Sequence, residues 1–350
     1  MDMFDISDIL SLHGGSVPIE LVPPEISRAS SAAIFREACR ADTRQIAELF
    51  RDTYGDSSHP CADEAGLTVL LDSHRMQMIV ATDHGRIVGC VAANALRTAG
   101  VMELGCLVVH RDYHRFRLAN QLHSQIVDHV TRDPGCHLVI AFVRGPSIYR
   151  LANRHPRVSL RAWGHDGGMN IARTEREHHV LAIGANPAAL IRRARPTAPL
   201  AVVERVLGRL ENICTVAREP SDIWTAPSLW DTSESNATPS CIELAAPARG
   251  GSCTDALAWV ASESTIHARI PHQFVFATLD RPEFTVGLRQ QGFSATAYLP
   301  AWMPDGDVRR DCLLMVKRHE GIEAAKRGFD SIIDAWNRRL QNARMSSVRS

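Results

Sequence analysis

The chain has 350 residues, of which 45% are hydrophobic and 22% charged, and this composition is typical of a globular protein. It excludes a disordered, collagen-like or coiled-coil chain. Basic and acidic residues number 39 each, so no overall field attracts nucleic acid or an anionic membrane. The length predicts about two domains.

The cysteines and the N-terminus predict a reduced protein without a membrane span. The nine cysteines are odd in number, and no two have the C-x-x-C spacing of a zinc ribbon. Cys90 and Cys106 lie in apolar runs, where thiols are usually buried. The acidic start MDMFDISDIL does not resemble a secretory signal, and no apolar run reaches the length of a membrane span. We therefore expect a cytoplasmic location.

Residues 1–30 have no clear periodicity and are expected to be a leader. Beyond them, amphipathic periodicity and turn residues predict regular elements in quick succession. Helices are expected at residues 41–55, 62–74, 118–135 and 146–156. Strands are expected at residues 34–40, 101–113, 137–143, 158–164 and 177–184, and as a hairpin over 76–96 that turns at 83–85. This order over 31–185 predicts an α/β (α+β) domain with a mixed, mostly antiparallel sheet flanked by helices.

The rest of the chain predicts a connection and a second, smaller unit. Two helices are expected at 186–194 and 200–213, followed by a Ser/Pro-rich run, so 186–240 is interpreted as an interdomain connection. The unit at 241–318 alternates strands and helices, and a helix is expected within 319–350.

The segment from Met102 to Leu122 is the strongest candidate for a functional site. An apolar strand leads through the loop HRDYHRFR, with its histidines and arginines, into a helix that begins near Leu118. Unpaired backbone N–H groups and cationic side chains at a helix start predict an anion site. A solvated basic loop is the alternative.

The run MELGCLVVHRDYHRFRLANQL resembles the central motif of the GCN5-related N-acetyltransferases (GNAT). In that family a loop Q/R-x-x-G-x-G/A binds the pyrophosphate of acetyl-CoA, and HRFRLA, residues 114–119, takes its place here. Ala119 fits the last small position, whereas His114 replaces the usual Gln or Arg and Arg117 stands where the first glycine is usual. A side chain there either blocks the phosphate or contributes its guanidinium.

The resemblance implies roles for individual residues. The strand ending at 107–109 would pair with the pantetheine arm, and its amides would stabilise an oxyanion on the thioester. Glu103 matches the general base, and Tyr149 matches the tyrosine that protonates the CoA thiolate. A strand salt bridge and a packed aromatic are their structural alternatives. The implied cofactor-binding residues are Leu107, Val108, Val109, His114, Arg115, Phe116, Arg117, Leu118, Ala119 and Asn120. No metal is implied.

Residues 241–318 resemble the last third of an acetyltransferase but lack a pyrophosphate loop. They are interpreted as a degenerate GNAT-like half-domain without its own cofactor, which could cover the acceptor cleft with Tyr298, Trp302 and Asp311. Each of these three side chains could instead be structural. His178 and His179 are adjacent on a strand and point to opposite faces, so structural or substrate-facing roles are favoured over metal binding.

These features predict an acyl-CoA-dependent N-acyltransferase that moves an acetyl group from acetyl-CoA to a primary amine of a small metabolite, by direct attack in a ternary complex. Two alternatives remain. One is transfer from an acyl-carrier protein, whose phosphopantetheine brings no adenosine diphosphate for the altered loop to hold. The other is a non-catalytic CoA-binding or regulatory protein. A nucleic-acid binder is disfavoured, because no basic stripe is interleaved with aromatics.

Overall fold

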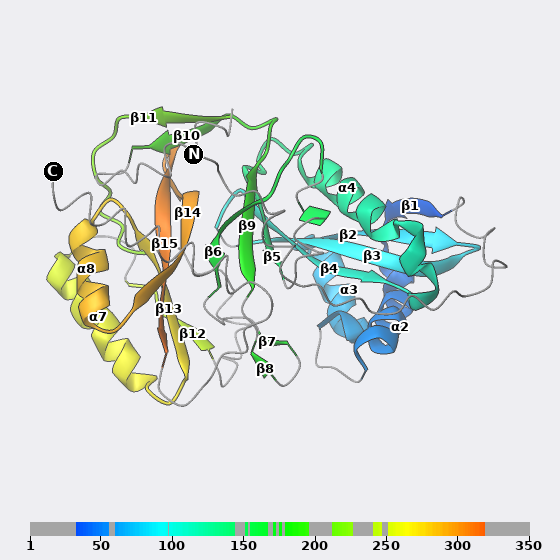
Figure 1. Cartoon of the computed structure of the whole chain (residues 1–350), viewed down its shortest axis with the longest axis horizontal. Helices are drawn as coiled ribbons and strands as arrows, with labels where there is room; N and C mark the ends of the chain where they lie inside the picture. The colour runs from blue at the N-terminus through cyan, green and yellow to red at the C-terminus, as the bar shows by residue number, and fades with distance from the viewer. Residues whose placement is uncertain are drawn as a thin grey trace, which may run out of the picture.

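The computed structural model describes residues 33–55, 60–96, 98–143, 151–152, 155–166, 171–172, 175–176, 179–195, 212–226, 241–246 and 251–318. The described residues within 33–185 are called the N-terminal unit, and the described residues within 241–318 are called the C-terminal unit (Figure 1). The predicted leader, the predicted helix within 319–350 and most of the one at 146–156 lie outside the described residues.

The N-terminal unit alternates strands and helices much as the sequence predicts. Its helices are α2 (Thr43–Tyr54), α3 (Glu64–Asp72) and α4 (Leu118–Val130), with 3-10 turns η2 (Arg40–Asp42), η3 (Pro60–Ala62) and η4 (Arg111–Phe116). Its strands are β1 (Ile34–Glu37), β2 (Met76–Asp83), β3 (Arg86–Ala95), β4 (Val101–Val109), β5 (Leu138–Val143), β6 (Arg161–His165), β7 (Ile171–Ala172), β8 (Glu175–Arg176) and β9 (Val180–Ala185).

Helices cover both faces of strands β2 to β4 (Figure 1). The buried side of α4 packs on one face through Leu118, Leu122 and Ile126. On the other face, α2 contributes Ile46 and Phe50 to a separate apolar cluster. Burial of the apolar side of α4 against the sheet fixes the position of this helix. The first turn of α4 is therefore held at the end of β4.

The C-terminal unit contains β12 (Cys241–Glu243), α7 (Cys253–Ile266), β13 (His272–Thr278), α8 (Pro282–Gln290), β14 (Ser294–Asp305) and β15 (Val308–Arg318). Its strand order β12-β13-β15-β14 begins with a parallel pair and continues with antiparallel pairs. The strands β4-β5-β9-β6 of the N-terminal unit have the same order and the same directions. The two units therefore share one topology over these four strands.

Thirteen of the described strands join into one sheet, in which antiparallel pairs predominate. The predicted mixed, mostly antiparallel sheet flanked by helices is confirmed. The two units meet where Gly164 of β6 pairs with Ala297 of β14. Arg309 of β15 adds a second link, because its Nη1 donates to the Ala99 carbonyl oxygen of the N-terminal unit at 2.7 Å.

The predicted helix at 186–194 is wrong. Residues 187–190 form a turn and β10 (Ile191–Ala194) is a strand that pairs in parallel with β11 (Ile213–Val216) and with β15. Arg193 of β10 is fully buried and its Nε donates to both carboxylate oxygens of Asp311, at 2.8 Å each. This buried ion pair holds the segment extended. Of the helix predicted at 200–213, residues 200–211 lie outside the described residues, and Ile213 begins β11.

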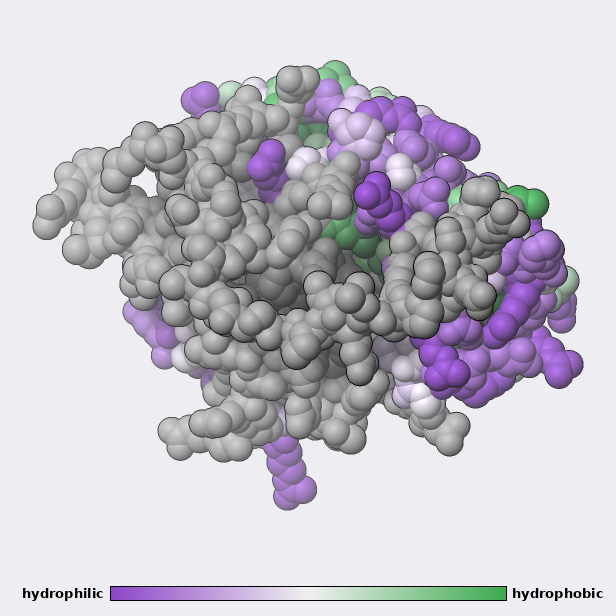
Figure 2. Space-filling model, turned by 45° about the vertical axis from the view of Figure 1, so that its right-hand side comes forward, coloured by the Kyte–Doolittle hydropathy of each residue, from purple (hydrophilic) through white to green (hydrophobic). Residues whose placement is uncertain are grey.

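No helix in the described parts of the chain is long and apolar enough to cross a membrane. On the face that Figure 2 shows, the described surface of the right-hand side is mostly hydrophilic.

Candidate functional site

An opening between β4 and β5 begins partway along the two strands. β4 pairs with β5 only from Val101–Leu138 to Leu104–Ala141, although both strands continue beyond this point. Among the described strands, none pairs with β5 on this edge after Ala141. The two strands therefore part toward their carboxyl ends, and the carboxyl ends of parallel strands are where α/β folds commonly bind ligands.

A β-bulge in β4 accompanies this opening. Cys90 of β3 lies opposite Val108 and Ala92 opposite Gly105, so that Cys106 and Leu107 together oppose a single residue of β3. The Cys106 backbone is left-handed, with φ 53°. Because a bulge bends the strand that carries it, β4 follows β3 while it turns away from β5.

Glu103 lies at the apex of the opening, one residue before the last β4–β5 pair. Its neighbour Leu104 is buried in the cluster beneath α4, so Glu103 points to the opposite face of the sheet. The carboxyl group is partly buried, and burial raises its pKa to about 7. Such a carboxylate can accept a proton near neutral pH.

Asn94 lies beside Glu103, and the sequence analysis missed it. It is the direct partner of Glu103 across β3 and β4 and is also partly buried. Residues opposite each other in an antiparallel pair project from the same face. The amide of Asn94 therefore lies beside the carboxylate, a neighbourhood that depends on the register of β3 against β4.

The backbone of Val109 faces the opening. The amide of His110 donates to the Val88 carbonyl oxygen at 2.9 Å, so the alternating pattern directs the N–H and C=O of Val109 away from β3. His114 Nε2 lies 2.9 Å from the Val109 carbonyl oxygen. Because a carbonyl only accepts, Nε2 is the donor. The His114 side chain therefore folds back onto the end of β4, and the Val109 amide faces the opening between β4 and β5.

Arg117 adopts the conformation that a glycine would favour at its position. Its backbone has φ 55° and ψ 18°, and its side chain is exposed. Arg117 is also the N-cap of α4, and its side chain makes no capping hydrogen bond at this helix start. The Asn120 amide donates to the Arg117 carbonyl oxygen at 3.0 Å, whereas the amides that precede it in a first helical turn have no intrahelical acceptor, so this helix start can receive an anion. The guanidinium lies on the solvent side and does not fill the turn.

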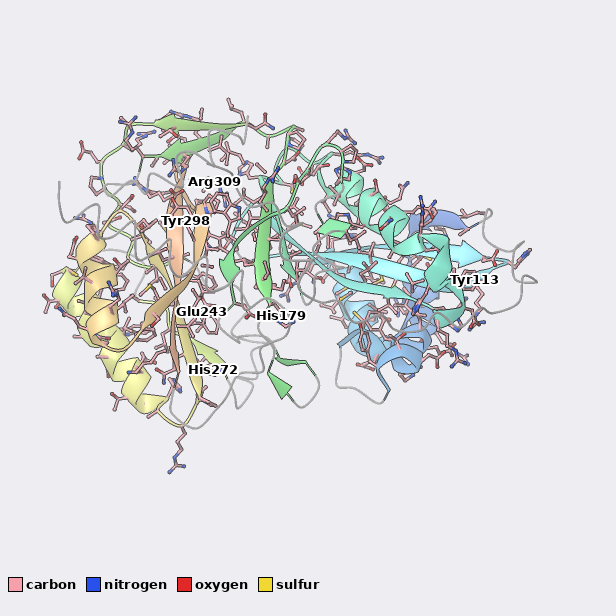
Figure 3. All side chains as sticks on the ribbon, in the orientation of Figure 1. Tyr113, His179, Glu243, His272, Tyr298 and Arg309 are labelled. Carbon is pink, nitrogen blue, oxygen red and sulfur yellow. The ribbon has the colours of Figure 1, made fainter. Side chains whose placement is uncertain are left out.

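Tyr113 fixes the loop between β4 and α4. Its hydroxyl donates to Asp83 Oδ2 at 2.6 Å, which ties η4 to the β2–β3 hairpin and, together with burial, raises the pKa of the tyrosine. The predicted turn at 83–85 is confirmed, with His84 and Gly85 both at positive φ. Figure 3 shows Tyr113 at the far side of the molecule from Tyr298 and Arg309.

The remaining predicted site residues divide into three groups. Val108 and Leu118 are buried in the core, so only their backbones can meet a ligand, whereas Leu107, Ala119 and Asn120 are partly buried near the opening. Tyr149 and the side chains of Arg115 and Phe116 lie outside the described residues.

Three residues suggested as acceptor contacts are part of the core instead. Tyr298, Trp302 and Asp311 are each about 1% exposed. Asp311 accepts from Arg193, from the Tyr298 hydroxyl and from the Ala301 amide, the last at 2.8 Å. It fills the bulge of β14, so these three side chains do not face a cleft and the structural alternative is confirmed for each of them.

His179 is buried, and its Nδ1 lies 3.0 Å from Asp166 Oδ2. The Asp166 carboxylate also accepts from the His179 amide at 3.0 Å, which holds the residue after β6 against the residue before β9. This contact supports a structural role. His178 lies outside the described residues.

A family model described as acetyltransferase (GNAT) family matches residues 43–149, which include α2, the bulge, the opening and the start of α4. Residues 43–149 are a GNAT acetyltransferase domain. The match begins within the predicted domain of residues 31–185 and ends at Tyr149. The C-terminal unit lies outside it.

Several solved structures are similar to part of this chain. A phosphinothricin acetyltransferase from Sinorhizobium meliloti in complex with AcCoA is 20% identical over 44% of this chain and 88% of that one, with a TM-score of 0.37. A putative acetyltransferase from Salmonella typhimurium with acetyl-CoA is 17% identical over 44% and 93%, with a TM-score of 0.36. A chimera of Vibrio cholerae spermidine N-acetyltransferase and hSSAT is 15% identical over 45% and 96%, with a TM-score of 0.38. No curated protein matches the chain.

In the C-terminal unit, a segment of the chain itself fills the place that corresponds to the acetyltransferase opening. β12 pairs with β13 only as far as Glu243–Phe274. Beyond that point, Thr225 forms an antiparallel bridge with Ala277 on the same edge of β13. The Thr225 hydroxyl contacts the Ala246 carbonyl oxygen at 3.4 Å, on the side of the diverging β12 chain. We call residues 217–226 the strap. The strap therefore ends in the gap between β12 and β13.

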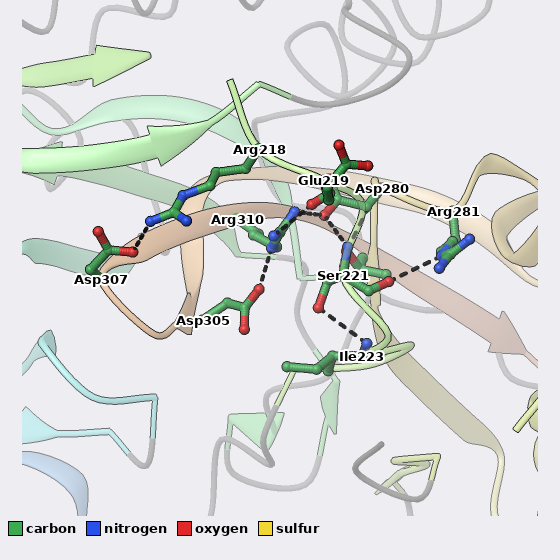
Figure 4. Close-up of polar contacts among 10 residues, drawn as sticks. Arg218, Glu219, Ser221, Ile223, Asp280, Arg281, Asp305, Asp307 and Arg310 are labelled. Carbon is green, nitrogen blue, oxygen red and sulfur yellow. Dashed lines mark hydrogen bonds and ion pairs between the residues drawn. The ribbon is translucent and has the colours of Figure 1, made fainter. Parts of the chain in front are cut away.

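Polar contacts hold the strap in place (Figure 4). Arg310 Nη2 donates to the Glu219 carbonyl oxygen at 2.9 Å, and Arg281 Nε donates to that of Ser221 at 3.0 Å. Trp224 is buried, and the Arg281 guanidinium lies 5.6 Å from its ring centre. The start of α7 differs from that of α4 as well, because Ser252 and Asp255 cap it with their own side chains. The C-terminal unit therefore differs from the N-terminal unit in two places. The gap between β12 and β13 is filled by the strap, whereas the one between β4 and β5 is open, and the start of α7 is capped by side chains of its own.

Proposed function

We propose that the chain is an acyl-CoA-dependent N-acyltransferase that moves an acetyl group from acetyl-CoA to a primary amine of a small metabolite. The observation that carries this proposal is the opening between β4 and β5, with Glu103 at its apex and the uncapped start of α4 after β4. The transfer proceeds by direct attack of the amine in a ternary complex.

The donor lies in the opening, with its pyrophosphate at the first turn of α4. When bound, acetyl-CoA supplies an activated thioester. The Val109 amide faces the pantetheine arm of the donor, and His114 Nε2 donates a hydrogen bond to the Val109 carbonyl oxygen. The left-handed backbone at Arg117 has the conformation that a glycine would adopt at this position of the loop. The exposed guanidinium of Arg117 adds positive charge beside the start of α4. The residues present therefore fit a CoA ester.

The acceptor approaches from the face that carries Glu103 and Asn94, opposite α4. An alkylammonium ion must lose a proton before its nitrogen can attack the thioester. Glu103, with its pKa raised to about 7, accepts this proton. Asn94 orients the amine through its side-chain amide. Tyr149 remains the proposed proton donor to the leaving thiolate, on the family resemblance alone.

The C-terminal unit is proposed to be a degenerate second copy that binds no donor. Its shared strand order, its filled opening and its capped α7 support this assignment. One chain therefore binds one molecule of acetyl-CoA. The C-terminal unit instead has a structural role. Its strand β14 pairs with β6 of the N-terminal unit, and its Arg309 holds the turn before β4 through the Ala99 carbonyl oxygen.

Isothermal calorimetry of the full chain with acetyl-CoA, dephospho-CoA and pantetheine tests the donor. We expect one site per chain with micromolar affinity, about −8 kcal/mol, and loss of most of that affinity with pantetheine. An amine panel with mass-spectrometric detection of acetylated product then identifies the acceptor class. Absence of binding at millimolar acetyl-CoA would contradict the proposal and favour a carrier-protein donor. Tight binding without turnover on any amine would favour a regulatory protein.

A further inference from the structure

Two thiols meet directly behind the bulge of β4. The Sγ atoms of Cys61, in η3, and Cys106, in the bulge, lie 3.7 Å apart. Cys61 is completely buried, whereas Cys106 is partly exposed. They come from segments 45 residues apart in the chain, yet only a small movement would bring the sulfurs to the bonding distance of about 2.0 Å.

A third thiol borders the pair and provides an internal comparison. Cys90 of β3 donates to the Cys106 carbonyl oxygen at 3.7 Å. It is fully buried, and burial raises its pKa far above the ordinary value for a thiol. The thiolate is the nucleophile in thiol–disulfide exchange, and the Cys90 thiol is directed at the Cys106 carbonyl oxygen, whereas that of Cys61 contacts the Cys106 sulfur, so Cys90 is the poorer attacking group. The partly exposed Cys106 is the thiol that a small oxidant can reach first.

We propose that Cys61 and Cys106 form a reversible redox pair that couples oxidation to the acyl-donor opening, with low-molecular-weight disulfides as the oxidant. The Cys106 thiolate attacks one sulfur of the oxidant RSSR and expels one thiolate, which leaves a mixed disulfide on Cys106. The Cys61 thiolate then attacks Cys106 Sγ and expels the second. Overall, two protein thiols and RSSR give one protein disulfide and two RSH.

The bond would act on the donor site through the backbone of the bulge. Cys61 belongs to the apolar cluster on the α2 side of the sheet, whereas Leu107 and Val109 pack toward α4. Drawing Cys106 toward Cys61 pulls the bulge away from the α4 side and moves the residues that face the opening. The oxidised chain should therefore bind acetyl-CoA less tightly. This consequence rests on the proposed function, whereas the thiol chemistry does not.

The test uses the full chain treated with glutathione disulfide, followed by alkylation, digestion and mass spectrometry. We expect a peptide linked through Cys61 and Cys106, an intact mass lower by two hydrogen atoms, and reversal by dithiothreitol. Cys61→Ser should instead retain glutathione on Cys106, and the matched control Cys90→Ala should still form the link. Absence of the linked peptide in the wild-type chain, or its loss in Cys90→Ala, would overturn the redox pair.

Calorimetry on the reduced and oxidised forms then tests the coupling to the donor. We expect the affinity for acetyl-CoA to fall about tenfold on oxidation, within the usual range of coupling between sites, and to recover on reduction. Equal affinity in the two forms would overturn the coupling. If the reduced chain binds no acetyl-CoA, the proposed function fails, while the linked peptide still decides whether the pair exists.

Discussion

Gly164 and Ala297 touch across the junction between the two units. An added Cβ at Gly164 would lie 2.3 Å from the Thr296 carbonyl oxygen and 2.5 Å from the Ala297 Cα. Both are backbone atoms, so neither can rotate aside. The backbone at Gly164 also has φ 138°, which side chains rarely adopt. β6 and β14 can pair here because β6 carries no side chain at this position.

We therefore predict that Gly164→Ala lowers the free energy of unfolding by about 2–4 kcal/mol. Urea denaturation measures the change. Gly105→Ala is the matched control, because a Cβ there meets no atom within 4 Å. Its effect should stay below about 1 kcal/mol. A Gly164→Ala chain as stable as the control would contradict the β6–β14 pairing.

Replacing Glu103 by glutamine should remove proton acceptance and preserve the shape of the site. We predict that Glu103→Gln lowers kcat/KM at least about 100-fold and leaves the affinity for acetyl-CoA unchanged. In the wild type, kcat/KM should rise with pH until about pH 7, where Glu103 becomes ionised, and this rise should be absent in the variant. The exposed Glu64→Gln is the control. Full activity in Glu103→Gln would exclude the residue as the base.

Two substitutions separate the charge of Arg117 from its backbone. Arg117→Gln keeps a side chain in the left-handed conformation but loses the guanidinium, and should weaken acetyl-CoA binding about tenfold at low salt, with less effect at high salt. Arg117→Gly should weaken binding equally but be about 1 kcal/mol more stable than Arg117→Gln, because glycine tolerates φ 55°. Calorimetry and thermal unfolding measure the two effects. Tighter binding by either variant would show that the arginine obstructs the phosphate.

Acid should destabilise the fold through His123. This side chain lies on the buried side of α4, its Nε2 has no hydrogen-bond partner among the described residues, and burial lowers its pKa to about 4. The unfolded chain binds a proton below pH of about 6.5 and the folded chain only below about 4. Stability is therefore complete above pH 6.5 and falls by about 3 kcal/mol as the pH drops to 4.

Urea denaturation at a series of pH values checks this dependence. His123→Leu should flatten the curve between pH 4 and 6.5, except for the contribution of His155, whose pKa is also lowered by burial. The exposed His84→Asn should leave the curve unchanged, because asparagine suits the same turn. An unaltered acid transition in His123→Leu would show that other groups control it.

Local patterns predicted most of the regular elements. The periodicity of 118–135 placed α4, and the turn residues at 83–85 placed the hairpin, because in each case short-range geometry and the buried face agree. The segment 186–194 was misjudged for the opposite reason. Its short apolar pattern is compatible with a helix, and only the distant partner Asp311 determines that Arg193 is extended and buried.

The sequence by itself determined the acetyltransferase motif, its glutamate on β4 and the order of strands and helices around them, since these follow from residue type and spacing. The tertiary structure decided which groups meet. The pairing of Asn94 with Glu103, the contact of Cys61 with Cys106 and the closure of the C-terminal opening by the strap each join segments that are remote in the chain. The register of strands and the packing of the core bring such segments together, and neither is encoded in a local pattern.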